Sequence, residues 1–265
     1  MGTFYLTCLI FVFGVLGVIN LEHGAVFMVG AYAALQAIVK LQLPLWAALV
    51  FAFVFAGLLG LVIDVLVLKP LRARNAPHLI PMIATIGLAI AINNLAQGIF
   101  GAENLRFPTE VLPQDVLEVA GLHLTVLELG IMLTSFALMA VLLVALKRTQ
   151  LGRALRAIAE SPKAAYLLGV NVEGLFMLTS FVAAGLGGIA GVLIGLYSNA
   201  LFPLMGQPML HKGIAVIILT SQVKELLGLD IAQEPAALGL KLAAIWGAIG
   251  TINPAAVLLS VLAVG

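Results

Sequence analysis

Few residues in this sequence could do chemistry, and the clearest of them interrupt long apolar runs. Asn20-Leu21-Glu22-His23-Gly24 divides a nearly uncharged stretch near the start of the chain. Ionisable groups at membrane depth are costly and usually face a cavity or a partner, so Asn20, Glu22, His23 and Gly24 are candidates for a translocation path. Unwound helix segments that present backbone groups to a solute are common in transporters. The alternative is a plain interfacial turn, after which Gly24 restarts the helix.

Other polar side chains lie inside apolar runs at helical spacing. Asp64 stands near the end of one run, about one turn before Lys69, and is predicted to be a snorkelling or paired interfacial carboxylate. Asn93, Asn94 and Gln97 lie within about one turn of a later run. They either bond between helices or line a pore.

Motifs for enzymes and cofactors are missing. The sequence has no G-x-x-x-x-G-K-[ST] phosphate loop, no H-E-x-x-H pair and no G-x-S-x-G elbow. His23, His78, His123 and His211 fall in separate segments, and the single cysteine, Cys8, lies in an apolar run. A net charge of +1 disfavours a nucleic-acid partner. We therefore predict no catalytic residues, no metal and no cofactor.

The composition indicates that transmembrane helices must position the polar residues named above. The 265 residues are 63% hydrophobic and 9% charged, and the mean hydropathy is +1.18. Soluble domains are about 45–50% apolar and about 25% charged. Nearly uncharged runs of about 20 residues match the length that a helix needs to cross a bilayer, where every backbone group must be bonded internally. The chain is predicted to be a polytopic membrane protein in contact with lipid.

Apolar runs give the expected architecture. The sequence predicts an all-α transmembrane bundle of about eight apolar segments in a single domain, 1–265. The segments are 3–19, 25–39, 45–68, 79–100, 124–146, 175–199, 211–228 and 239–264. The second is short enough to be a re-entrant or partial span.

Charges between the segments predict the orientation. Residues 69–78 carry three basic and no acidic residues, and residues 147–163 carry five basic and one acidic, for charges of +3 and +4. Residues 101–123 carry four acidic and one basic, for −3. Basic loops remain in the cytoplasm, so 69–78 and 147–174 are predicted inside and 101–123 outside. Counting back from 69–78 through the third, second and first segments places the N-terminus outside, if the first two both cross fully.

Small residues recur at helical spacing in the segment at 175–199. Gly187, Gly191 and Gly195 follow one another every four residues and therefore line one face, which Gly188, Ala183 and Ala184 widen. Such a face lets another helix approach closely, so we predict helix packing there.

A long basic connection follows the fifth segment. It reads KRTQLGRALRAIAESPKAAYLLGVNVEGLFML over residues 147–178. Ala154 to Ala159 favour a helix, Ser161-Pro162 can start a second short helix, and Gly169 can end it. This positively charged helical platform would lie either on anionic lipid or on a soluble partner.

Three stretches resemble one known family. LGRALRAIAESPKAAYLLGVNVEGLFMLTSFVAAGLGGIAGVL resembles the cytoplasmic loop and next helix of branched-chain amino-acid (Liv-type) ABC importer permeases. GVLGVINLEHGAVFMVGAY is similar to the family's N-terminal signature, and KPLRARNAPHLIPMIATIGLAI to its next loop and helix. The matches extend over residues 14–218 in family order.

The resemblance implies a multi-pass permease subunit in the inner membrane of a prokaryote. Its partners would be a second permease subunit, two ABC ATPase subunits that hydrolyse ATP, and a periplasmic substrate-binding protein. The loop at 152–172 corresponds to the family's ATPase-coupling helix. That role carries over to Gly152, Arg153, Arg156, Glu160, Ala164 and Gly169.

The two ends depart from the family pattern. Less sequence than in the family precedes GVLGVIN, and the tail at 220–265 is atypical. A truncated, non-functional permease is therefore one alternative. Permeases for urea, amides or other amino acids are a second, because their sequences are similar. An ion-coupled secondary transporter is a third, for which Glu22, His23 and Asp64 would supply the ionisable groups.

Overall fold

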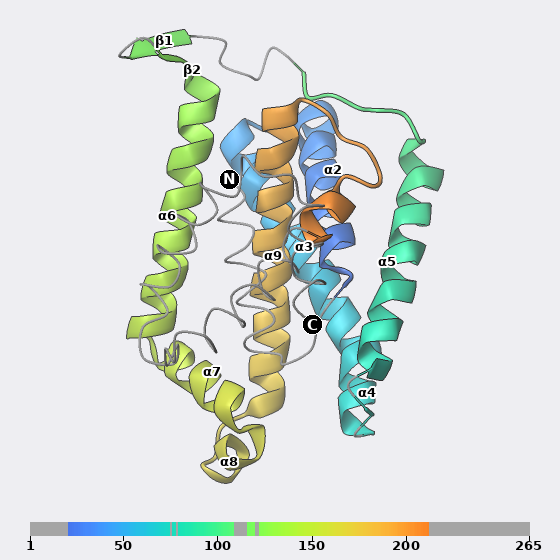
Figure 1. Cartoon of the computed structure of the whole chain (residues 1–265), viewed down its shortest axis with the longest axis vertical. Helices are drawn as coiled ribbons and strands as arrows, with labels where there is room; N and C mark the ends of the chain where they lie inside the picture. Colours follow the sequence, from blue (N-terminus) through green and yellow to red (C-terminus); the bar gives the residue numbers. More distant parts are fainter. Residues whose placement is uncertain (1–20, 75, 78, 109–115, 120–121, 212–265) are drawn as a thin grey trace, which may run out of the picture.

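The computed structural model of the chain describes residues 21–74, 76–77, 79–108, 116–119 and 122–211 (Figure 1). The described helices are α2 (His23–Leu41), α3 (Leu45–Ile63), the π-helix η1 (Asp64–Leu68), α4 (Lys69–Ala73), α5 (Leu79–Phe100), α6 (Val126–Arg148), α7 (Gln150–Glu160), α8 (Pro162–Leu167) and α9 (Val172–Ser198). Strands β1 (Val116–Val119) and β2 (Leu122–Thr125) pair antiparallel. Residues 206–211 are also helical.

Among the described residues, five helices are long and apolar enough to cross a membrane. They are α2, the continuous helix Leu45–Ala73 formed by α3, η1 and α4, and then α5, α6 and α9. The predicted helical membrane bundle is thus confirmed. The prediction that the chain is entirely α-helical is not, because the acidic connection contains the two short strands. The predicted segments 3–19 and 239–264, and all of 211–228 beyond His211, lie outside the described residues.

Local signals in the sequence explain where several helices begin and end. Thr125 and Glu128 form a capping box at the start of α6, with each side chain bonded to the backbone of the other residue. The Asn171 side chain accepts a 3.0 Å bond from Gly174 N at the start of α9. Gln42 ends α2 in the left-handed conformation, and Pro44 precedes α3.

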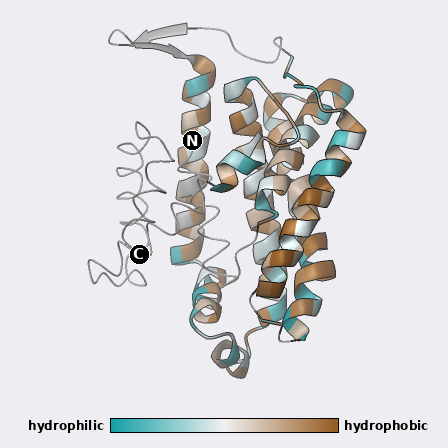
Figure 2. Cartoon of the chain, turned by 45° about the vertical axis from the view of Figure 1, so that its right-hand side comes forward, coloured by the Kyte–Doolittle hydropathy of each residue, from teal (hydrophilic) through white to brown (hydrophobic). Residues whose placement is uncertain are grey.

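Burial separates interior from peripheral helices within the described part of the chain. The apolar windows of α2 and α9 are each 72% buried, against 33% for Leu45–Ala73, 28% for α5 and 19% for α6. The exposed faces of the peripheral helices are apolar, and hydrophobic colouring predominates along them in Figure 2. Such faces suit contact with lipid or with further apolar helices. His23, at the start of the interior helix α2, and Glu22 just before it are among the buried polar residues described below.

The charged connections lie at opposite ends of the bundle. In Figure 1, α4, α7 and α8 lie at the bottom, and residues 101–108 and strands β1 and β2 lie at the top. The basic residues of 69–78 and 147–163 therefore share one end, opposite the described residues of the acidic 101–123 connection, as the charge pattern predicts. Backbone bonds of 2.9 Å between Leu105 and Leu201 join the segments after α5 and α9 at the acidic end.

This orientation predicts opposite labelling of two exposed positions, Glu103 and Lys147. In a Cys8→Ser background, a membrane-impermeant maleimide added to intact cells is expected to label Glu103→Cys. It should label Lys147→Cys only after permeabilisation. Labelling of Lys147→Cys from outside would invert the assigned orientation.

Candidate functional site

The basic end carries a helical pair, α7 and α8, built by local caps. Thr149 Oγ1 accepts a 3.0 Å bond from Gly152 N at the start of α7 and donates to Ala145 O of α6. The Ser161 side chain accepts from Ala164 N at the start of α8, and Pro162 occupies the first turn. Gly169 follows α8 at φ +81°. The predicted start at Ser161-Pro162 and end at Gly169 are confirmed.

The six residues assigned to ATPase coupling fall in different surroundings. Gly152 is buried, and a Cβ there would collide with the carbonyl oxygen of Leu146. The other five are exposed: Arg153, Arg156, Glu160, Ala164 and Gly169. Arg156 Nη1 donates back to Leu146 O, so Gly152 and Arg156 both anchor α7 to the end of α6.

The sequence reasoning missed an apolar surface on α8. Tyr166, Leu167 and Leu168 are 71%, 84% and 81% exposed. A groove of about 530 Å³ lies beside them, lined by Pro162, Lys163, Tyr166, Leu167, Val172 and Glu173. Large apolar side chains grouped on the surface of a charged loop are a candidate binding surface, and the YLL triplet within a basic connection is the signal that could have revealed it.

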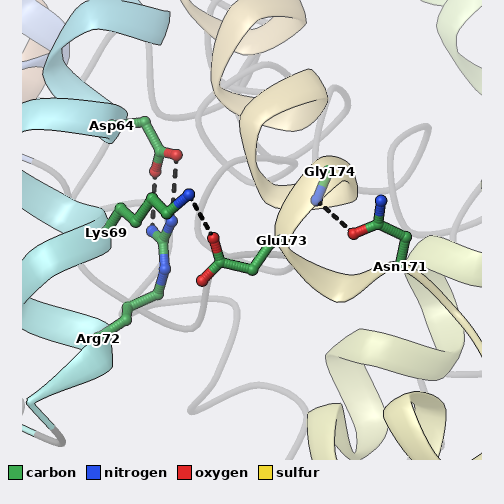
Figure 3. Close-up of polar contacts among 6 residues, drawn as sticks. All are labelled: Asp64, Lys69, Arg72, Asn171, Glu173 and Gly174. Atoms are coloured by element: carbon green, nitrogen blue, oxygen red, sulfur yellow. Dashed lines mark hydrogen bonds and ion pairs between the residues drawn. The ribbon is translucent and has the colours of Figure 1, made fainter.

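Asp64 differs from its predicted environment. Its side chain is fully buried and forms bonds of 2.7 and 3.0 Å with the two terminal nitrogens of Arg72 (Figure 3). The prediction of a paired carboxylate is confirmed, but a snorkelling position is wrong. Lys69, about one turn along the helix, pairs with a different residue. Its amine lies 2.9 Å from Glu173 Oε2 of α9.

The polar break before α2 lies inside the bundle. Asn20 lies outside the described residues, whereas Glu22 and His23 are each only 3% exposed. The His23 ring lies against Gly187, near the middle of α9, where a Cβ would be 2.8 Å from Nε2. Figure 1 likewise shows α2 beginning midway along the bundle.

Neighbouring elements hold the same break in place. Leu21 N donates a 3.3 Å bond to Thr85 Oγ1 of α5. Gly24 meets the backbone of Gly206, where the helical residues 206–211 begin. Asn93 is buried on α5, whereas the exposed Asn94 bonds to Ile90 O of its own helix. The structure therefore brings Glu22, His23 and Gly24 together with parts of α5, α9 and the residues after α9.

The predicted glycine strip of α9 packs against α2, against α3, and against the side chains of Leu201 and Phe107. Gly187 and Gly191 face α2, where a Cβ at Gly191 would collide with the carbonyl oxygen of Phe27. Gly195 faces Leu201 and Phe107, and a Cβ at Gly195 would lie 3.2 Å from each of their side chains. Gly188 lies between Gly30 of α2 and Ala56 of α3. Backbones can approach this closely only where side chains are absent.

Several branched-chain amino acid permeases are similar to this chain in sequence. The High-affinity branched-chain amino acid transport system permease protein LivH of Escherichia coli K12 is 31% identical over 206 residues, which are 74% of this chain and 66% of the relative. The corresponding BraD of Pseudomonas aeruginosa is 31% identical over 207 residues, with the same shares. The Probable branched-chain amino acid transport permease protein LivH of Methanocaldococcus jannaschii is 32% identical over 186 residues, 66% of this chain and 56% of the relative.

The match therefore spans slightly less than two thirds of the length of the bacterial relatives. No solved structure matches the chain. The family model described as Branched-chain amino acid transport system / permease component matches residues 7–228, which include every described span and the α7–α8 pair. The chain is a multi-pass membrane protein that belongs to this family of transport permeases.

Proposed function

We propose that the chain is the membrane-spanning permease subunit of an ABC importer that moves branched-chain amino acids across the inner membrane. Residues 1–265 would form its single transmembrane domain. Two ABC ATPase subunits would hydrolyse the ATP, beside a second permease subunit and a periplasmic substrate-binding protein. The family match over residues 7–228 carries this proposal.

The α7–α8 pair supports the assignment of the ATPase-docking surface. It lies at the basic, cytoplasmic end and exposes Tyr166, Leu167 and Leu168 beside a groove. A lipid-bound platform would bury such side chains in the headgroup region, whereas a groove of this size suits an inserted protein side chain. Of the two alternatives for this platform, anionic lipid and a soluble partner, we favour the soluble partner because of the groove. Gly152, Arg153, Arg156, Glu160, Ala164 and Gly169 would shape and present this surface.

The break before α2 supports the assignment of the translocation path. Glu22, His23 and Gly24 lie near the middle of the bundle, at the start of α2. Polar residues at a helix start inside a bundle are a recurring feature of transporter binding sites. We extend the proposal to Asn20 because it is part of the same break.

Replacing Gly169 by valine is expected to reduce recovery of the ATPase subunits in mild detergent by about tenfold. A β-branched residue at positive φ carries a backbone cost of about 1–3 kcal/mol, which would unwind the end of α8 and disorder the docking surface. The measurement is co-purification of the ATPase subunits encoded beside the chain, using equal amounts of inserted permease.

Gly101→Val is the matched control. Gly101 has φ +82° and open space around it, as Gly169 does, but it lies at the acidic end. Gly101→Val should therefore retain the complex. Normal recovery with Gly169→Val would contradict the coupling assignment, and no complex with the inserted native chain would contradict the proposed function itself.

A further inference from the structure

Two contacts join α4 to the first turns of α9 at the basic end of the bundle. Lys69 Nζ lies 2.9 Å from Glu173 Oε2 (Figure 3). The Arg72 guanidinium lies over the Phe176 ring, 4.7 Å from its centroid. A charge pair and a cation–π contact therefore attach the cytoplasmic end of the α3–α4 helix to the start of α9.

The Asp64–Arg72 pair stiffens the helix on the α4 side of this junction. Asp64 is the first residue of η1, and Arg72 lies in α4, beyond the end of η1 at Leu68. A π-helical turn is rare and interrupts the regular bonding of a helix. The bidentate pair spans that interruption, so α4 is held to α3 on both sides of it.

The other side of the junction is continuous with the α7–α8 pair. Glu173 lines the groove beside α8 and also forms the ion pair with Lys69. Asn171 caps α9 through Gly174 N, immediately after the turn at Gly169. Glu173 therefore belongs both to the lining of the groove and to the contact between α4 and the start of α9.

We propose that Lys69 and Glu173 are positioning residues that transmit movement of the α7–α8 pair to α3. This inference rests on the proposed function, in which the ATPase subunits move α7–α8. The pair fixes α4 to the start of α9, and Asp64–Arg72 carries that constraint across η1 into α3. Because α3 and α2 both pack on α9, the movement reaches the helices around the buried break.

Energetics separates this role from a purely structural one. The Lys69 and Glu173 side chains are 43% and 50% exposed, and solvent-exposed ion pairs contribute little to folding stability. Breaking the pair should therefore leave the melting temperature unchanged. A constraint between two moving helices can matter for the transport cycle although its static contribution is small.

The test measures leucine transported per ATP hydrolysed, with the complete transporter in proteoliposomes and radiolabelled leucine as the probe. Lys69→Glu and Glu173→Lys are each expected to lower this ratio about fivefold, within the range of coupling effects at sites that touch no ligand. The double variant Lys69→Glu/Glu173→Lys should recover most of the ratio, because the pair re-forms with reversed charges. The KM for leucine should stay constant in all three.

Lys147→Glu is the matched control, since it makes the same charge change on an exposed lysine at the basic end. A native ratio in both single variants would overturn the inference. A double variant as impaired as the singles, or an equal loss with Lys147→Glu, would also overturn it. If charge reversal prevents insertion, Lys69→Met and Glu173→Gln remove the pair without reversal and should show the same uncoupling. An inserted native chain that forms no complex would overturn the proposed function and this inference with it.

Discussion

Alanine in place of Gly191 is expected to lower the free energy of unfolding by about 1–3 kcal/mol, because the interface between α9 and α2 has no room for one more carbon. A Cβ at this position would collide with the backbone carbonyl oxygen of Phe27. A backbone atom cannot rotate away as a side chain can, so the two helices would have to separate. Leucine at Gly191 should prevent a monodisperse protein from forming. Unfolding in mixed SDS–detergent micelles measures the first effect, and gel filtration measures the second.

Gly87→Ala provides the control for the change from glycine to alanine. Gly87 lies on the exposed face of α5 with nothing within 4 Å of its Cβ position. Alanine there adds only helix propensity, worth up to about 1 kcal/mol in favour of folding. Equal stability of the Gly191→Ala and Gly87→Ala proteins would contradict the close approach of α2 and α9.

Methionine in place of Arg72 is expected to destabilise the protein by about 3 kcal/mol, because it leaves the buried Asp64 carboxylate without its partner. Both carboxylate oxygens of Asp64 bond to Arg72, and none of the Asp64 side chain is exposed. Replacing both residues by apolar ones, Asp64→Leu with Arg72→Met, should recover most of the loss, since a buried ion pair can often be exchanged for apolar residues. The same SDS titration gives the full double-mutant cycle.

Lys69→Met is the matched control for this cycle. Its ion pair with Glu173 is about half exposed, so the expected loss is below about 1 kcal/mol. A similar loss in Arg72→Met and Lys69→Met would show that the two pairs do not differ as their burial implies. A double variant no more stable than Arg72→Met would show that Asp64 is not the source of the cost.

The sequence by itself determined the features that depend on neighbouring residues. Uncharged runs predict the membrane spans, because each span must satisfy its own backbone inside lipid. Basic and acidic connections predict which end is which. Ser161, Pro162 and Gly169 predict the limits of α8, because caps and left-handed turns are built within one helical turn. These features need no knowledge of where distant helices lie.

Only the tertiary structure decided which distant residues meet. Asp64 lies about one turn from Lys69 in the sequence, yet Arg72 binds it, because side-chain direction along α3–α4 depends on helical angle and on the π-helical turn. The 2.9 Å contact of Lys69 with Glu173 joins residues more than a hundred positions apart. Nothing local predicts such a contact.

The buried break and the glycine strip show the same division. Their residue types predict polar atoms inside the bundle and a smooth helix face. That His23 lies on Gly187, or Gly24 on Gly206, depends on how α2, α9 and residues 206–211 cross. Local sequence selects each helix and its caps, whereas the packing of several helices at once selects their partners, because each crossing depends on all the side chains between them.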